Sequence, residues 1–260
     1  MPSQPPPPFS HEIWDRVLGR YVDSSGLFDY VAMKQNEGDL ERYSRLLAAF
    51  SPDSNPELFP TEAARLAYWI NGYNAAAIQT VLHYYPIKSV LEVKRPALLF
   101  FFPGKSGFFY FQRSTFGAKQ YSLYHLENKV VRERFEDPRI HFALNCASKG
   151  CPKLPRDAFS AENLDAELDR ETRKFLSEQR NLRLDHHQRT LYLSEIFDWY
   201  EDDFVDWYHR KFPARKASVV AYIEHYAAAD RAKELHDGAN GYSVQFTPYD
   251  WSLNDRRPKD

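Results

Sequence analysis

The chain has 260 residues, of which 43% are hydrophobic and 27% charged, and 34 lysines and arginines face 36 acidic residues. This length suits one large domain or two small ones with an ordinary buried core. Charges of both signs are mixed along the chain, so no basic stripe predicts nucleic-acid binding. No run of about 18 apolar residues is present, so no membrane span is expected. The few glycines, 10 in all, disfavour a phosphate-binding loop, and no cofactor is predicted.

The first ten residues, MPSQPPPPFS, predict a flexible proline-rich leader. They have neither the positive charge nor the apolar stretch of a secretory signal. We therefore expect a cytoplasmic protein, or an exported one whose leader has been removed. Residues 11–260 are expected to form a single globular domain. Two cysteines in so long a chain do not make a disulfide framework.

Helical periodicity first appears at residues 11–21 and 40–50, where apolar side chains recur every three or four positions. The longest predicted helix covers residues 62–84, with Thr61 as its N-cap and Pro86 just beyond its end. This helix is apolar nearly all round, which is typical of a helix at the centre of a domain.

Many aromatic residues follow at 98–112 and predict a β-hairpin that serves as a cleft wall or a partner surface. Ser122 caps an expected helix at 123–134, and the apolar run Ile140–Asn145 predicts a short strand. The remaining elements are a helix at 160–176, a hairpin at 182–193, helices at 196–212 and 217–229, and a strand or loop at 242–253. Together they predict an α+β fold, in which the central buried helix packs against a small, mainly antiparallel sheet and is surrounded by helices. Papain-like and transglutaminase-like folds share this arrangement, by analogy alone.

Two asparagines, Asn71 and Asn74, share one face of the predicted central helix. A buried amide costs stability unless it is hydrogen-bonded. Either both amides hold neighbouring loop backbone, or one faces a cleft and orients a catalytic group or a substrate amide. Trp69 and Tyr73, from the same segment, are candidate substrate-binding residues.

The segment HFALNCASKGCP brings together His141, Asn145, Cys146, Ser148 and Cys151. A cysteine at the mouth of a loop can act as a nucleophile where a base lowers its pKa, although unpaired cysteines are also common core residues. Zinc is disfavoured because the gap between the two cysteines is at the long end for a pair of zinc ligands, and the chain has no second pair. No metal is therefore predicted. A disulfide between them is sterically conceivable but disfavoured in a cytoplasmic setting.

A continuous strand over Ile140–Cys146 would point His141 and Asn145 to one face and Cys146 to the other. We therefore expect His141 to approach Cys151 or a central-helix asparagine more closely than it approaches Cys146.

The run FDWYEDDF at 197–204 is acidic and aromatic. Asp198 and Asp202 are at helical spacing, as are Trp199 and Asp203, and an exposed, solvated helix face is the usual explanation. Glu127, on the helix that precedes His141, is a further candidate that signals nothing by itself.

Five stretches resemble the family known as domain of unknown function 547: YWINGYNAAAI at 68–78, SLYHLEN at 122–128, RIHFALNCASKGCPKL at 139–154, LYLSEIFDWYEDDF at 191–204 and YDWSLND at 249–255. They span nearly the whole chain in the family's order. The resemblance implies no established activity. It suggests that a common site contains Asn71, Asn74, Glu127, His141, Asn145, Cys146, Ser148, Cys151 and Trp199. The family often has a histidine directly after the glutamate, where this chain has Asn128; His125 is a possible substitute on another helix face.

Three functions remain open. The leading hypothesis is a cysteine-dependent enzyme acting on an amide, thioester or related acyl group, with Cys146 or Cys151 as nucleophile, a histidine as base, and Asn71, Asn74 or Asn145 as orienting or oxyanion groups. The second is a non-catalytic module that binds an unknown small molecule or peptide. The third is thiol redox chemistry, in which Cys146 and Cys151 form a reversible pair.

Overall fold

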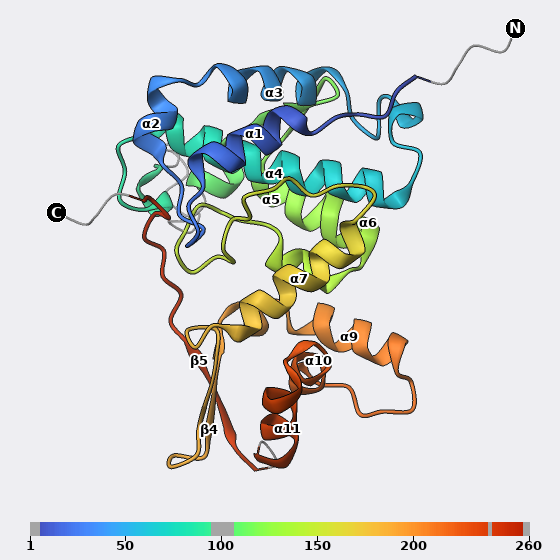
Figure 1. Cartoon of the computed structure of the whole chain (residues 1–260), viewed down its shortest axis with the longest axis vertical. Coiled ribbons are helices and arrows are strands. Elements are labelled where there is room, and N and C mark those ends of the chain that lie inside the picture. The colour runs from blue at the N-terminus through green and yellow to red at the C-terminus, as the bar shows by residue number, and fades with distance from the viewer. Residues whose placement is uncertain (1–5, 95–106, 239–240, 257–260) are drawn as a thin grey trace, which may run out of the picture. The chain divides into compact units, whose positions relative to one another are not determined.

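A computed structural model describes residues 6–94, 107–238 and 241–256 of the chain. Its many helices and short strands confirm the α+β class (Figure 1). Among the described residues, no helix is long and apolar enough to cross a membrane. The chain divides into two compact units: the first comprises Met1–Phe135, Leu144–Asp165 and Trp251–Asp260, and the second Glu136–Ala143 and Ala166–Asp250. The single domain expected over 11–260 stays a prediction.

The first unit is built around α4 (Glu62–Tyr84), which has the predicted bounds and is buried along most of its length. As predicted, Thr61 caps the helix, because its Oγ1 accepts a hydrogen bond from the Ala64 N–H at 3.0 Å. Gly72 lets an aromatic ring approach the helix closely: a Cβ there would lie 2.6 Å from Cε1 of Phe116. That ring comes from the strand that packs against α4.

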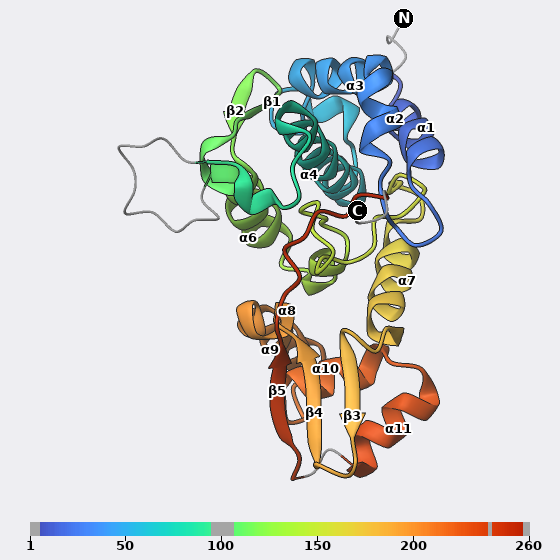
Figure 2. The ribbon, with the colours of Figure 1, turned by 90° about the vertical axis from the view of Figure 1, so that its left-hand side faces the viewer.

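A two-stranded antiparallel sheet lies beside α4, as Figure 2 shows. It consists of β1 (Ser114–Phe116) and β2 (Lys119–Tyr121). Other helices enclose the same unit, and the prediction of a central helix among helices and a small sheet is therefore confirmed for it. Its remaining elements are α1 (Glu12–Tyr21), α2 (Tyr30–Gln35), α3 (Gly38–Ala49), α5 (Leu123–His125), α6 (Glu133–Phe135), the 3₁₀ turns at Pro56–Leu58 and Val90–Glu92, and the π-helical segments at Gly107–Phe111 and Leu126–Arg132.

Two predicted strands are wrong where the structure describes them. Residues 107–111 of the expected 98–112 hairpin are helical, while residues 98–106 lie outside the described part of the chain. The expected strand Ile140–Asn145 is a 3₁₀ helix at Pro138–Phe142 followed by irregular chain. Asp137 starts that helix by accepting a hydrogen bond from the Arg139 N–H at 3.0 Å, and Pro138 occupies its first turn. The run is apolar because it is buried on all sides, so its composition alone does not distinguish strand from helix.

The second unit has a three-stranded sheet in the order β3 (Leu182–Asp185), β4 (Thr190–Ser194), β5 (Ser243–Thr247). The β3–β4 hairpin is antiparallel, as predicted, whereas β5 returns from far along the chain and pairs with β4 in parallel. Figure 2 shows the three strands side by side with helices behind them. The helices are most of α7 (Leu164–Ser177), α8 (Ile196–Trp199), α9 (Glu201–Lys211), α10 (Val219–Tyr226) and α11 (Ala229–Gly238).

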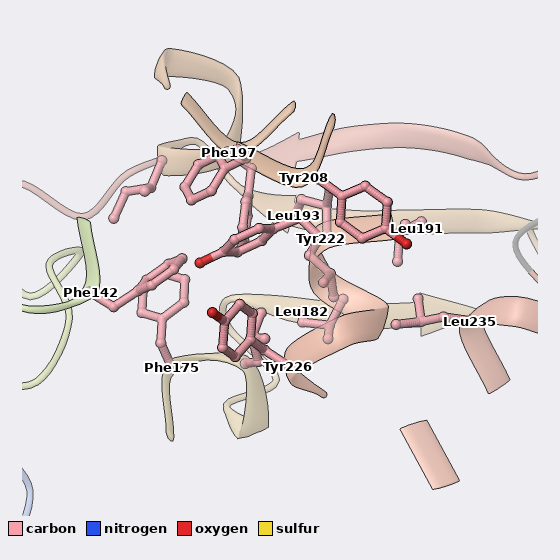
Figure 3. Packing of buried hydrophobic residues seen from close by; sticks show 14 residues of the cluster. Phe142, Phe175, Leu182, Leu191, Leu193, Phe197, Tyr208, Tyr222, Tyr226 and Leu235 are labelled. Carbon is pink, nitrogen blue, oxygen red and sulfur yellow. The ribbon is translucent and has the colours of Figure 1, made fainter. Parts of the chain in front are cut away.

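An aromatic and aliphatic cluster fills the interior of the second unit (Figure 3). The ring of Phe142 lies 4.7 Å from that of Phe175 and 5.7 Å from that of Phe204, measured between centroids. Leucines of both hairpin strands close the cluster from the sheet side. Packing of this kind accounts for the high aromatic content of the sequence without any ligand.

Candidate functional site

Asn71 is fully buried in α4 and holds one loop residue by both of its amide atoms. Its Nδ2 donates to the carbonyl oxygen of Phe159 at 2.8 Å, and its Oδ1 accepts from the Phe159 N–H at 3.0 Å. Such a reciprocal pair satisfies the buried amide and fixes the loop backbone at that point. These contacts match the alternative in which the amide holds neighbouring loop backbone.

Asn74, one helical turn later, holds the beginning of the cysteine loop. Its Oδ1 accepts a hydrogen bond from the Asn145 backbone N–H at 2.7 Å. Asn145 is itself buried, and its Nδ2 donates to the Pro152 carbonyl oxygen at 2.7 Å. The Asn145 side chain thus connects the two ends of the segment between Asn145 and Pro152. Asn74 of α4 holds the backbone of the same residue.

The interior of this loop is held in the left-handed region of backbone conformation. Ala147 has φ of 64°, which is unfavourable for a residue with a Cβ. Its N–H donates to Asn145 Oδ1 at 2.8 Å, and its carbonyl accepts from the Asn254 N–H at 2.9 Å. The Asn254 side chain also donates to Asn145 Oδ1 at 3.3 Å. Asn254 lies in the YDWSLND segment. The sequence does not predict it as a site residue, because nothing near it in the chain indicates that Asn145 is its partner.

A disulfide joins Cys146 to Cys151, with their Cα atoms 6.4 Å apart. This distance is within the range of ordinary disulfides. The expectation that this bond is disfavoured is therefore wrong for this structure. The Cys146 N–H also donates to Cys151 Sγ at 3.0 Å. Cys146 is half-buried and Cys151 is buried, at 4% exposure, so the two residues differ in their access to solvent.

Ser148 lies between the two cysteines and is almost completely buried, at 1% exposure. Among the described residues, its hydroxyl has no hydrogen-bond partner. Its backbone forms a bridge with Leu253, and the next N–H, of Lys149, donates to the Ser252 carbonyl at 2.8 Å. The segment around Leu253 therefore supports the disulfide loop along its length.

Tyr73 and Glu127 contact each other in the first unit. The Tyr73 hydroxyl donates to Glu127 Oε2 at 3.0 Å, and Glu127 belongs to the π-helical segment Leu126–Arg132. Tyr110 stacks on Tyr124 with centroids 4.2 Å apart. Burial, followed by the neighbouring Tyr124 and Glu127, raises the pKa of the Tyr110 hydroxyl.

Two further predicted positions of this unit serve local structure. The Trp69 ring is buried against Phe116, with centroids 5.7 Å apart. Asn128, at the position where the family often has histidine, donates to the Tyr124 carbonyl at 3.0 Å and accepts from Arg132 at 2.6 Å. Its amide is thus engaged with its own helical segment.

His141 and Trp199 belong to the second unit. The His141 ring is buried, its Nε2 is 2.7 Å from Asp203 Oδ2, and it stacks on Tyr200 at a centroid distance of 3.9 Å. Asp203 therefore contacts a buried histidine and does not simply belong to a solvated helix face. Its spacing from Trp199 predicts its place on the helix but gives no indication of the histidine. Trp199 is 39% exposed and stacks on Tyr249 at 4.9 Å.

Within each unit, the predicted residues make the following contacts. One group in the first unit surrounds the disulfide, and Glu127 with Tyr73 forms another. His141 pairs with Asp203 inside the second unit. The expected approach of His141 to Cys151 relied on a strand that is not formed, and stays a prediction. Among the described residues, no group of three or more His, Cys, Asp and Glu side chains is arranged to hold a metal ion.

Comparison with known proteins identifies a family for the central part of the chain. Residues 59–176 match the family described as "Protein of unknown function, DUF547", which confirms the resemblance. The match covers α4, the π-helical segment with Glu127 and the whole disulfide loop. No curated protein and no solved structure matches the chain.

Proposed function

We propose that Cys146 and Cys151 form a reversible dithiol–disulfide couple that exchanges electrons with thiol substrates. The observation that carries this proposal is the bond between their sulfurs across one short loop. The sequence alone left this redox chemistry as one of three alternatives. It is favoured here because both cysteines of the chain take part in the same bond.

The unequal burial of the sulfurs assigns them different roles. Cys146 is half-buried and is the sulfur that a substrate thiolate can reach, whereas Cys151 is buried. Disulfide exchange requires an accessible sulfur to be attacked and a second sulfur that leaves as a thiolate. The Cys146 N–H, 3.0 Å from Cys151 Sγ, donates to the leaving sulfur. A hydrogen bond to the charged form favours it, and so promotes departure of the Cys151 thiolate.

The reaction conserves atoms and electrons in two exchanges. A substrate thiolate attacks Cys146 Sγ, an S–S bond forms between them, and the Cys146–Cys151 bond breaks to release the Cys151 thiolate. A second substrate thiolate then attacks the substrate sulfur of this mixed disulfide and releases the Cys146 thiolate. The protein gains two electrons, the substrate becomes a disulfide, and the two protein thiolates take up the protons that the substrate thiols gave to solvent. The reverse sequence reduces a substrate disulfide.

The asparagines act as positioning residues in this proposal. Asn74, Asn145 and Asn254 hold the backbone on both sides of Cys146, so the loop keeps one shape when the sulfurs separate. Rigid support of this kind keeps the two sulfurs within bonding reach and favours rapid reclosure of the disulfide.

The experiment is a redox titration of the full chain in glutathione buffers, with alkylated cysteines counted by mass spectrometry. A redox-active pair titrates between roughly −120 and −270 mV, whereas a purely structural disulfide resists reduction until below about −300 mV. A midpoint in the upper range supports the proposal, and a midpoint below −300 mV overturns it. Ser148→Ala is the matched control, because it changes the same loop without removing a sulfur.

Two cysteine variants test the assigned roles. Cys151→Ser keeps the accessible sulfur and is expected to form a mixed disulfide with oxidised glutathione readily. Cys146→Ser keeps only the buried sulfur and is expected to react at least tenfold more slowly. Equal rates would contradict the assignment.

The cysteine-dependent acyl-transfer hypothesis stays a prediction that the reduced protein can test. It requires a free thiolate, which the disulfide form lacks. Hydrolysis of a thioester by the reduced wild type, lost in one of the variants Cys146→Ser and Cys151→Ser and retained in the other, would favour it, because acyl transfer needs a single nucleophilic cysteine.

A further inference from the structure

A cavity of about 350 Å³ lies in the first unit, away from the cysteine loop. Its walls come from α3, from the middle of α4 and from the chain at residues 113–116 that enters and forms β1. In Figure 2, β1 lies beside α4, with α3 near the same part of the helix. This volume falls within the range of pockets that bind small molecules.

Several hydrogen-bond donors in the lining have no partner among the described residues of the protein. They are the guanidinium of Arg113, the side-chain amide of Gln79 and the hydroxyls of Ser44, Ser114 and Thr115. The helices α3 and α4 contribute Ser44 and Gln79, and the chain at residues 113–115, at the start of β1, contributes the others. A concentration of unpaired donors at one cavity is suited to a ligand with acceptor oxygens.

The charge of the lining favours an anion. Arg113 and Arg45 both line the cavity, against a single carboxylate, Glu41. Glu41 Oε2 is 3.8 Å from the Arg45 guanidinium and offsets that charge, whereas Arg113 has no carboxylate partner among the described residues. Guanidinium groups bind carboxylate and phosphate oxygens in pairs, which combines charge with geometry.

The rest of the lining is apolar. Leu47 and Phe116 are buried, and Ala76 of α4 is exposed by only 3%. Together with the half-buried Ala48, these side chains form the apolar part of the lining next to the donors. A hydrated inorganic ion would leave that surface unused, whereas a small organic anion would cover it.

We propose that this cavity binds a small organic anion, with a carboxylate or phosphate group held by Arg113 and Gln79 and a short hydrocarbon part against Leu47, Ala76 and Phe116. The site shares no residue with the cysteine loop. The proposal is therefore independent of the redox function, and the two can fail separately.

The test is a titration of the full oxidised chain with butyrate, monobutyl phosphate, acetate and butylammonium, followed by NMR shifts of backbone amides. Butyrate or monobutyl phosphate is expected to bind saturably at millimolar concentration or below, and comparison of the two identifies the preferred head group. Acetate lacks two methylene groups and is expected to bind roughly tenfold more weakly than butyrate. Butylammonium is expected not to bind. No saturable binding of either butyl anion, or equal binding of butylammonium, would overturn the proposal.

Charge variants locate the site. Arg113→Gln is expected to weaken binding of the better butyl anion at least tenfold, because it removes the uncompensated cation. Gln79→Met, which preserves size without the amide, is expected to weaken it several-fold. The matched control is Arg42→Gln. Arg42 lies on α3, one of the elements that form the cavity wall, but it does not itself line the cavity, and its guanidinium is 3.7 Å from Asp39. Equal losses in Arg113→Gln and Arg42→Gln would mean general charge attraction and would refute the site.

Discussion

The interiors of the two units are held together in different ways. In the first, α4 buries Asn71 and Asn74, and each amide is paired with one particular loop backbone group. In the second, a cluster around Phe204 is made of rings and aliphatic side chains. A buried amide is satisfied in few geometries, whereas apolar side chains can repack with little loss of contact. The comparison shows that two amides buried in the otherwise apolar core of the first unit specify the shape of one loop, whereas the apolar cluster of the second unit provides stability.

The largest expected effect comes from the apolar interior. Phe204→Ala removes a ring whose centroid lies 4.8 Å from that of Tyr222 and 5.1 Å from that of Phe197. Loss of a fully buried phenylalanine should lower the free energy of unfolding by about 3–5 kcal/mol. Urea unfolding monitored by tryptophan fluorescence measures it. Phe246→Ala, at a ring that is 39% exposed, is the control, with a change within about 0.5 kcal/mol. A similar small change for Phe204→Ala would show that this interior tolerates cavities.

Loss of a buried amide in the first unit should lower the free energy of unfolding by less, and should also affect the cysteine loop. Asn74→Ala leaves the buried Asn145 N–H without its acceptor and should cost about 1–3 kcal/mol. Because that N–H is adjacent to Cys146, the midpoint of the redox titration should shift as well. Gln35→Ala, which removes an exposed amide from α2, should change neither quantity. A stability loss with an unchanged midpoint would separate Asn74 from the cysteine loop.

The first unit should also depend on pH through His11. Its Nδ1 lies 2.7 Å from the Tyr43 hydroxyl, and burial lowers the pKa of His11 from 6.5 to about 4. Since the unfolded chain binds the proton more readily, stability is present above pH 6.5 and is lost as pH falls towards 4. The loss should be about 1–2 kcal/mol, less than the full shift implies because the residue is half-buried. Comparing unfolding at pH 7 and pH 4.5, His11→Gln should flatten this dependence, and His187→Gln, at an exposed site, should not.

The smallest expected losses of stability come from removal of the helix caps, and they are of equal size in the two units. Thr61 caps α4 of the first unit and Ser218 caps α10 of the second, each accepting a backbone N–H at 3.0 and 3.1 Å. Replacing either residue by alanine should cost about 1 kcal/mol, measured by thermal unfolding. Very unequal losses would mean that one helix start is held mainly by tertiary packing, which would sharpen the contrast between the units.

Local chemistry explains which expectations succeed. The bounds of α4 follow from a cap at Thr61, a long apolar pattern and a proline at 86, all of which act within a few residues. The β3–β4 hairpin likewise follows from alternating side chains around a polar turn. By contrast, β5 pairs in parallel with β4 after some 50 residues of intervening chain, and no local pattern predicts such a partner.

The sequence by itself determined the helical frame, the placement of two amides on one face of a buried helix, and the family that residues 59–176 match. Only the tertiary structure decided what those groups contact. The run at 140–145 is buried throughout, and its apolar residues have no period that distinguishes strand from helix, so Asp137 and Pro138 set its conformation. Asn254 meets Asn145 across 109 positions of sequence, and Asp203 meets His141 across 62. Such pairs form because a buried polar group must find a partner, and the partner is whatever the folded chain brings within reach.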